Sequence, residues 1–138
     1  MSRPTSVIRV AAGIIINAQQ EILVAQRPAH ASHPGFWEFP GGKVEFHETP
    51  QQALIREFKE EIGIKILDAK LFMQVEHAYT KPDRVVALTV WQIEKYLGKP
   101  YGAEGQLVRW VTLDTLPTLT FPAANNKIVE TLVSKYKN

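Results

Sequence analysis

The chain has 138 residues, 45% of them hydrophobic, which predicts one globular domain over residues 1–138 with a buried core. The absence of cysteine excludes disulfide bonds, thiol chemistry and thiolate zinc sites, and a net charge of +2 is too small to indicate binding to a nucleic-acid polymer. No apolar run approaches the roughly 18 residues that a membrane span needs, and the N-terminal residues lack a signal-peptide pattern, so we expect a cytoplasmic protein with no membrane partner.

The first part of the chain predicts extended segments. Residues 7–16 are mostly apolar and rich in β-branched side chains, which is typical of a central strand. Residues 21–26 predict a second strand, and because only a short turn separates the two, we expect them to form a hairpin. Residues 27–35 contain two prolines and two histidines and predict a loop, which leads into a short extended piece at residues 36–39.

Two glycines follow this extended piece. Pro40, Gly41, Gly42 and Lys43 come directly after the aromatic residue Phe39. Glycines let the backbone turn sharply and approach a ligand, and their carbonyl and amide groups can then face a metal ion or a phosphate.

The next segment predicts a helix with well-defined ends. Thr49 can cap the helix, Pro50 suits its first position, Gln52 completes a capping box, and Gly63 is a typical terminator. At about 100° per residue, one face of this helix is apolar. That face consists of Leu54, Ile55, Phe58 and Ile62.

Negative charge is concentrated in the same segment. Five glutamates lie between Gly42 and Ile64, namely Glu45, Glu48, Glu57, Glu60 and Glu61. The last three lie on one side of the helix, where like charges are unfavourable unless a positive partner sits among them. One alternative is a solvated charged face in which Arg56 pairs with Glu60. The other is a divalent ion such as magnesium, which takes oxygen ligands, in an enzyme that acts on a phosphate ester or anhydride.

The second part of the chain predicts more strands and a final helix. Residues 66–79 contain one or two strands, residues 85–93 are apolar on both alternating faces and should be covered on both sides, and residues 107–111 form a short strand. Residues 124–137 predict a helix whose inward side chains are Ile128, Leu132, Val133 and Tyr136. The order of the elements predicts a mixed β-sheet with helices on both faces.

The acidic segment as a whole resembles the Nudix box, whose pattern is G-x5-E-x7-R-E-U-x-E-E-x-G-U, where U is a bulky apolar residue. Gly42 and Glu48 match the first two fixed positions, and residues 56–64 match the rest, with Phe58 at one U position. The resemblance implies a Nudix hydrolase with the α/β/α sandwich fold of that family, in which a mixed β-sheet lies between helices.

Further segments resemble the MutT-type members of this family. They are residues 13–15, 37–43, 82–84, 101–106 and 121–125. The resemblance implies hydrolysis of 8-oxo-dGTP to the monophosphate and pyrophosphate, with magnesium, or in its place manganese, as the cofactor. It also implies a monomer whose partner is a small-molecule nucleoside triphosphate.

The resemblance also assigns roles to residues. The metal ligands would be the carbonyl of Gly41 and the side chains of Glu57, Glu60, Glu61 and Glu104. Lys43 would face the phosphates, Arg56 would orient the helix carboxylates, and Glu48 would support the loop. Either Glu57 or Glu104 would act as the base that takes a proton from water. The nucleobase would be recognised by Asn125, with Arg27, Phe39 and Asp83 nearby.

Several alternatives remain open at this point. Asn125 could instead cap the last helix, Phe39 could be a core aromatic residue, and Asp83 could be a turn residue. The histidines are not spaced as metal ligands, and we expect no catalytic role for them. Residues 25–28, together with Trp37, also resemble Nudix enzymes that act on CTP. A non-catalytic Nudix-fold binding module is a more distant alternative, since such proteins lose box glutamates that this chain keeps.

Overall fold

The computed structural model describes residues 6–31, 33–80 and 83–136. Within these ranges lie strands β1 (Ser6–Ile14), β2 (Glu21–Gln26), β3 (Trp37–Glu38), β4 (Gly41–Lys43), β5 (Lys65–Thr80), β6 (Asp83–Leu97) and β7 (Val108–Thr112). The helices are α1 (Pro50–Ile62), α2 (Ala123–Tyr136) and the short 3-10 helix η1 (Leu116–Thr118). Pro82 and Lys137, which belong to two of the segments discussed above, lie outside the described residues.

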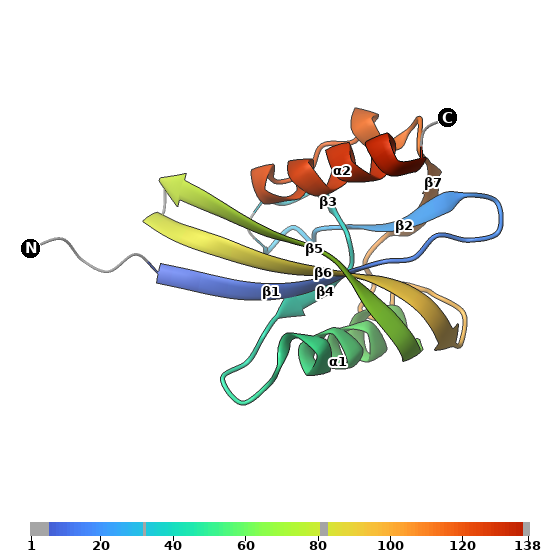
Figure 1. The fold of residues 1–138 in the computed structure, drawn as a ribbon, viewed down its shortest axis with the longest axis horizontal. Coiled ribbons are helices and arrows are strands. Elements are labelled where there is room, and N and C mark those ends of the chain that lie inside the picture. The colour runs from blue at the N-terminus through green and yellow to red at the C-terminus, as the bar shows by residue number, and fades with distance from the viewer. Residues whose placement is uncertain (1–5, 32, 81–82, 137–138) are drawn as a thin grey trace, which may run out of the picture.

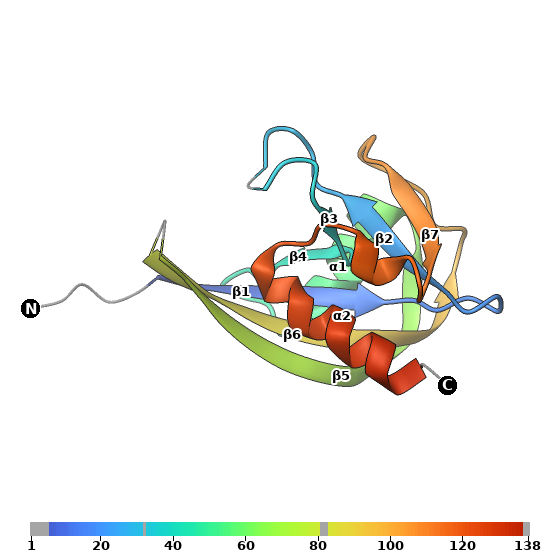
Figure 2. The ribbon, with the colours of Figure 1, turned by 90° about the horizontal axis from the view of Figure 1, so that it is seen from above.

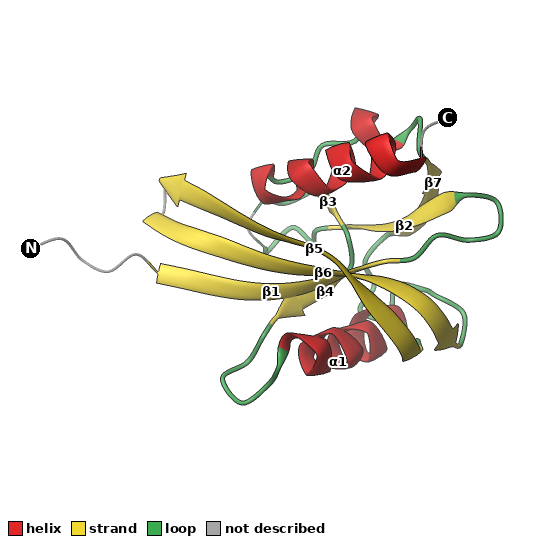
Figure 3. Cartoon of the chain, in the orientation of Figure 1, coloured by secondary structure: helices red, strands yellow, loops and turns green. Residues whose placement is uncertain are grey.

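The strands form two sheets. One sheet has the order β4-β1-β6-β5, in which β1 and β6 are parallel and the other neighbours are antiparallel. The other sheet has the order β3-β2-β7 and is antiparallel throughout. Helices α1 and α2 lie on opposite faces of the larger sheet (Figure 1, Figure 3). The predicted α/β class, with a mixed sheet between helices, is therefore confirmed.

The second half of strand β1 is buried on both faces, because it separates two halves of the core. Ala11, together with Ile15 just after the strand, packs in the cluster that includes α1. Ala12 and Ile14 pack in the cluster that includes α2. Side chains alternate along a strand, so a strand covered on both sides needs apolar residues at consecutive positions. This explains the nearly continuous apolar run of β1.

The predicted hairpin of residues 7–16 and 21–26 is wrong over most of its length. β1 pairs with β4 and β6, whereas β2 pairs with β3 and β7. The two strands meet only beside the turn, where the N–H of Leu23 donates to the carbonyl of Ile15 (3.1 Å) and Ile16 bridges to Ile22. They then diverge into different sheets, as Figure 2 shows. A run that is apolar on both faces does not indicate which strand will be its neighbour.

Helix α1 begins and ends as predicted. Thr49 Oγ1 accepts from the N–H of Gln52, the Gln52 side chain accepts from the N–H of Thr49, and Gly63 adopts φ 72° in the left-handed region. The buried face differs from the predicted apolar face at two positions. Ile55, predicted to face inward, is 40% exposed, and Ala53 is buried instead. Leu54, Phe58 and Ile62 are buried as predicted.

The remaining elements differ from the predictions mainly in their bounds. The predicted glycine loop contains β4, which pairs with β1. Residues 66–79 belong to one long strand, β5, with irregular register near Asp68 and Met73. Strand β6 is covered on both sides as expected, with Leu88 in the core half next to α2 and Ile93 in the half next to α1. In α2, Ile128 and Leu132 are buried as predicted.

Candidate active site

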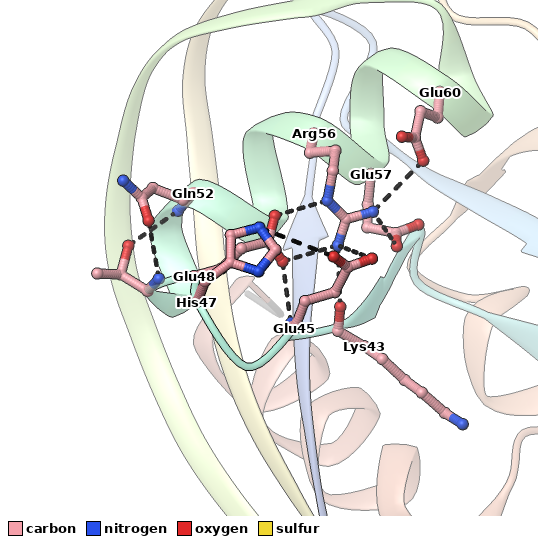
Figure 4. A network of polar contacts seen from close by, with 9 residues as sticks. Lys43, Glu45, His47, Glu48, Gln52, Arg56, Glu57 and Glu60 are labelled. Atoms are coloured by element: carbon pink, nitrogen blue, oxygen red, sulfur yellow. Dashed lines mark hydrogen bonds and ion pairs between the residues drawn. The ribbon is translucent and has the colours of Figure 1, made fainter.

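Arg56 connects the acidic residues of the segment (Figure 4). Its Nε and Nη2 donate to the two carboxylate oxygens of Glu48 at 2.6 and 2.8 Å, which is a bidentate pair. Its Nη1 donates to Glu57 Oε1 at 2.8 Å and to Glu60 Oε2 at 3.4 Å. Nη2 also donates to the carbonyl of Lys43 at 3.1 Å, so one guanidinium group joins α1 to β4 and to the loop between them.

This arrangement explains the protonation states around Arg56. The hydrogen bonds from Arg56 lower the pKa of Glu48 to about 2, with help from the Glu45 backbone N–H. The same pair with Glu48, together with Glu57, raises the pKa of Arg56. Glu48 therefore remains a carboxylate and Arg56 remains a cation at any pH at which the protein would work.

Gly42 is required by the position of the Glu57 carboxylate. A Cβ atom at Gly42 would overlap the carboxyl group of Glu57, which Arg56 holds in place, so a side chain at Gly42 would displace that carboxylate. Gly41 and Gly42 pair with Ala12 and Ala11 in the sheet, which holds the glycine backbone rigidly beneath α1. Gly42 thus lets a helix carboxylate lie directly against a strand, while a side chain at Gly41 would meet the backbone of β1 at Ala11 and Ala12.

Glu61 provides the strongest indication of a cation. Its Oε2 is buried and has no hydrogen-bond partner among the described residues. Burial, and then the neighbouring Glu57, Glu38 and Glu104, raise the pKa of Glu61 far above its ordinary value. A buried carboxylate with an unpartnered oxygen and several carboxylate neighbours fits a divalent ion, which would supply the missing charge and the missing contact.

Glu60 is the predicted ligand that stands apart from Glu61. Glu60 is 52% exposed on its side chain, pairs with Arg56 and lines neither of the cavities described below. Among the described residues, no group of three or more histidine, aspartate or glutamate side chains is arranged as a ready-made ion site. Lys43 is exposed, and its ammonium group points away from the carboxylates (Figure 4).

The first cavity has a volume of about 580 Å³ and lies between the two sheets. Its apolar lining includes Val10, Ala12, Phe39, Val86 and Leu88. Its polar lining includes Arg27, Asn125, Gly41, Lys43, Glu57 and Glu61, so the structure brings most of the predicted site residues to one place.

Asp83 is exposed at the start of β6 and does not line this cavity. Phe39 is 3% exposed and stacks on Phe121, with ring centroids 5.2 Å apart, so it serves both the core and the cavity wall.

Asn125 lies in the first turn of α2 and not before it. The helix begins at Ala123, so the alternative that Asn125 caps the helix is wrong. The N–H of Ala124 instead donates to the hydroxyl of Tyr79 on β5, at 3.1 Å. Asn125 is therefore free to present its side chain to the first cavity, which it lines.

The second cavity has a volume of about 880 Å³ and opens beside the first. Its polar lining includes Gln26, His30, Glu104 and Gln106. Both cavities share Arg27, Pro28, Glu38 and Glu61. Arg27 Nη1 and Glu38 Oε1 form an ion pair at 2.6 Å in this shared wall. Burial raises the pKa of Glu38, although Arg27 opposes the rise.

In the first cavity, sequence reasoning missed the polar wall residues His33, Glu38, Tyr79 and Arg84. The guanidinium carbon of Arg84 lies 5.7 Å from the centre of the Tyr79 ring, and Arg84 Nε is buried without a hydrogen-bond partner among the described residues. Burial, Arg27 and Arg84 lower the pKa of His33, which favours the neutral imidazole. Arg84 could have been found from sequence, because positions 84, 86 and 88 share one face of a strand.

Comparison with known proteins gives concordant matches. The family model of the NUDIX domain matches residues 11–131. The 8-oxo-dGTP diphosphatase of Escherichia coli (strain K12) is 41% identical over 125 residues, which are 91% of this chain and 95% of that protein. The CTP pyrophosphohydrolase of the same organism is 36% identical over 110 residues, which are 80% of this chain and 78% of that protein.

Solved structures agree with these sequence matches. A structure of MutT, from a study of the proteins of Aliivibrio salmonicida and Vibrio cholerae, superposes with a TM-score of 0.80 at 36% identity. The match covers 95% of this chain and 100% of that chain. None of the helices in the described ranges is long and apolar enough to cross a bilayer.

Proposed function

Since this chain belongs to the NUDIX domain family and is a pyrophosphohydrolase, we propose that it hydrolyses 8-oxo-dGTP to 8-oxo-dGMP and pyrophosphate. Such an enzyme removes an oxidised nucleotide before it is incorporated into DNA. The observation that carries the proposal is the position of Glu61, which has a buried, unpartnered carboxylate oxygen and lines both cavities. The first cavity has an apolar wall with Asn125 beside it, which suits a nucleobase, and its acidic end with Lys43, Glu57 and Glu61 suits the phosphates and an ion.

Nudix hydrolases generally use divalent metal ions, and the charge around Glu61 fits one. We assign Mg²⁺, with Mn²⁺ as a substitute, to the carbonyl of Gly41 and the carboxylates of Glu57, Glu60, Glu61 and Glu104. Such an ion, when bound, neutralises the triphosphate and lowers the pKa of a neighbouring water molecule.

In this proposal, residues of the chain position the substrate and accept the proton from water. Arg56 fixes the Glu57 carboxylate against β4, and Lys43 offers its ammonium group to phosphate oxygens at the mouth of the first cavity. Glu57 or Glu104 accepts the proton of the attacking water. The water oxygen bonds to the β-phosphorus, and the bond from that phosphorus to the oxygen bridging the α-phosphorus breaks. The nucleoside monophosphate leaves, and pyrophosphate keeps the new oxygen.

Base selection is assigned to Asn125 with Arg27 and Phe39, all of which line the first cavity. An asparagine amide offers a donor and an acceptor side by side. Oxidation of guanine at its five-membered ring creates an adjacent carbonyl and N–H, which match that amide. Asp83 is not part of this set, because it lines neither cavity.

The working form is proposed to be a cytoplasmic monomer in which residues 1–138 make a single Nudix hydrolase domain. The family match over residues 11–131 supports the domain assignment.

The substrate assignment is tested by kcat/KM with Mg²⁺ for 8-oxo-dGTP, dGTP, CTP and 5-methyl-dCTP, with identification of the nucleotide product. We expect a strong preference for 8-oxo-dGTP and release of pyrophosphate. The alternative, a CTP pyrophosphohydrolase, is favoured by the 36% identity to the Escherichia coli enzyme of that name. A preference for the cytosine nucleotides would establish that alternative and leave the ion assignment standing.

The role of Asn125 is tested by Asn125→Ala, with Asn126→Ala as the matched control at the exposed neighbouring position. A buried partner left without its hydrogen bond costs about 1–3 kcal/mol, so the ratio of kcat/KM for 8-oxo-dGTP over dGTP should fall by roughly 10-fold or more. The control should leave the ratio unchanged. An unchanged ratio in Asn125→Ala would remove Asn125 from base recognition.

A further inference from the structure

The loop that carries Glu104 is attached to the C-terminal end of α1. The N–H of Tyr101 donates to the carbonyl of Ile62 at 3.1 Å, and the N–H of Ala103 donates to the carbonyl of Glu61 at 2.9 Å. The last turn of a helix leaves its carbonyls without partners inside the helix. Two of these carbonyls are therefore satisfied by the loop between β6 and β7.

Gln106 adds a second connection between the same two segments. Its Nε2 donates to the carbonyl of Glu61 at 2.8 Å, and its Oε1 accepts from the N–H of Glu104 at 3.0 Å. One planar amide thus bridges the backbone of Glu61 to the backbone of Glu104. Both glutamates and Gln106 line the second cavity.

We propose that Gln106 is a positioning residue that fixes Glu104 relative to Glu61, so that the two carboxylates can act on one divalent ion. The inference rests on the proposed function, which assigns both glutamates as ion ligands. Gln106 does not touch the ion or the substrate in this role. It acts by holding the backbone of Glu104 against the end of α1 that carries Glu61.

The chemistry of the bridge is specific to glutamine. A side chain must donate at one end of a planar group and accept at the other to satisfy both backbone groups. Leucine has a similar shape but neither function, and asparagine has both functions but is one methylene shorter. Groups that orient ligands without touching the metal typically change metal affinity by 10–100-fold when they are removed.

The variants Gln106→Leu and Gln106→Asn test this inference, and Gln92→Leu is the matched control. Gln92 makes a similar amide contact, to the hydroxyl of Tyr136 at 3.1 Å, but lines neither cavity. Two quantities are measured on metal-free protein whose thermal unfolding is first shown to be cooperative. One is the affinity for Mn²⁺ by calorimetric titration, and the other is the amide hydrogen exchange of Glu104 before any ion is added.

We expect both Gln106 variants to bind Mn²⁺ about 10-fold more weakly and to exchange the Glu104 amide faster, while Gln92→Leu changes neither. In a Glu104→Gln background, Gln106→Leu should cause no further loss of affinity, because its effect passes through Glu104. If Leu at position 106 prevents folding, the Asn variant carries the test.

The inference fails if the Gln106 variants bind Mn²⁺ as the unmodified chain does, or if their effect persists in the Glu104→Gln background. If Glu104→Gln alone leaves the affinity unchanged, Glu104 is not a ligand, and both the ion assignment and the role of Gln106 fall. A failure to hydrolyse 8-oxo-dGTP would contradict the proposed substrate, but it would not alter the outcome of the Mn²⁺ measurements.

Discussion

Glu48 and Glu60 both contact Arg56, but they differ in how much water reaches them. The Glu48 side chain is 8% exposed and bidentate, whereas the Glu60 side chain is 52% exposed and makes one long contact. A half-exposed pair on a helix surface contributes about 0–1 kcal/mol to stability. The conformational stability of this segment therefore depends on Glu48, and Glu60 is available for another role.

The substitution Glu60→Gln tests whether Glu60 contributes to activity and not to stability. We expect kcat to fall by roughly 100-fold or more, because a group that stabilises charge during the reaction is lost, while the melting temperature hardly changes. Steady-state kinetics and thermal unfolding measure the two effects. Glu130→Gln, the same substitution on the exposed side of α2, should change neither. Full activity in Glu60→Gln would remove Glu60 from the ion site.

The pair of Glu48 with Arg56 should make stability depend on pH in a defined window. The pKa of Glu48 is about 2 in the folded protein, below its ordinary value of 4.5, so folding favours the carboxylate. Its contribution is complete above pH 4.5 and is lost as the pH falls toward 2. The difference in melting temperature between the unmodified chain and Glu48→Gln should therefore shrink as the pH is lowered through this window.

The control for this measurement is Glu94→Gln. Glu94 makes only a weak surface pair with Lys70, at 4.0 Å, with a side chain that is 43% exposed. Its difference from the unmodified chain should be small at every pH. A constant difference for Glu48→Gln across the window would show that the charge of Glu48 does not contribute to folding.

Two tyrosine hydroxyls tie helix α2 to the large sheet. Tyr79 on β5 accepts from the N–H of Ala124 at the start of the helix, and Tyr136 at its end pairs with Gln92 on β6. The first tie is one residue from Asn125, while the second lies outside both cavities. The two ends of α2 thus make the same kind of contact, one beside the first cavity and the other away from it.

We expect Tyr79→Phe to lower the preference for 8-oxo-dGTP over dGTP by about 3- to 10-fold, because the first turn of α2 loses its fixed position. Tyr136→Phe should cost a similar stability, about 1 kcal/mol, without changing that preference. Competition kinetics and urea unfolding measure the two quantities. An equal loss of preference in both variants would mean that general loosening of α2, and not the tie at Tyr79, is responsible.

At the scale of the whole molecule, the features predictable from sequence are those with local causes. Both ends of α1 depend on residues within a few positions, such as Thr49, Gln52 and Gly63, so their prediction is confirmed. The pairing of β1 with β6 joins segments far apart in the chain, and no local pattern distinguishes it from a hairpin with β2. The expected hairpin is wrong for that reason.

The same distinction holds for the cavities. The spacing of the glycines and glutamates in one short segment is recognisable in the sequence. In the structure, Gly41, Gly42, Glu57 and Glu61 line the first cavity. Tyr79 and Arg84 come from two long strands, and their common face becomes apparent only when the sheet is formed. Asp83 precedes Arg84 by one residue, and adjacent strand residues point to opposite faces, which explains why it lies outside.

Two parts of the chain line the first cavity. Most of its apolar residues and Asn125 come from β1, β6 and the start of α2, whereas Glu57 and Glu61 come from α1. If the proposed roles hold, changes in nucleobase preference and changes in hydrolytic rate arise from mutations in different stretches of the chain. Natural selection could retune such an enzyme toward a new nucleotide one substitution at a time, while every intermediate kept a working hydrolytic centre. This division of labour makes the fold well suited to the divergence of paralogues.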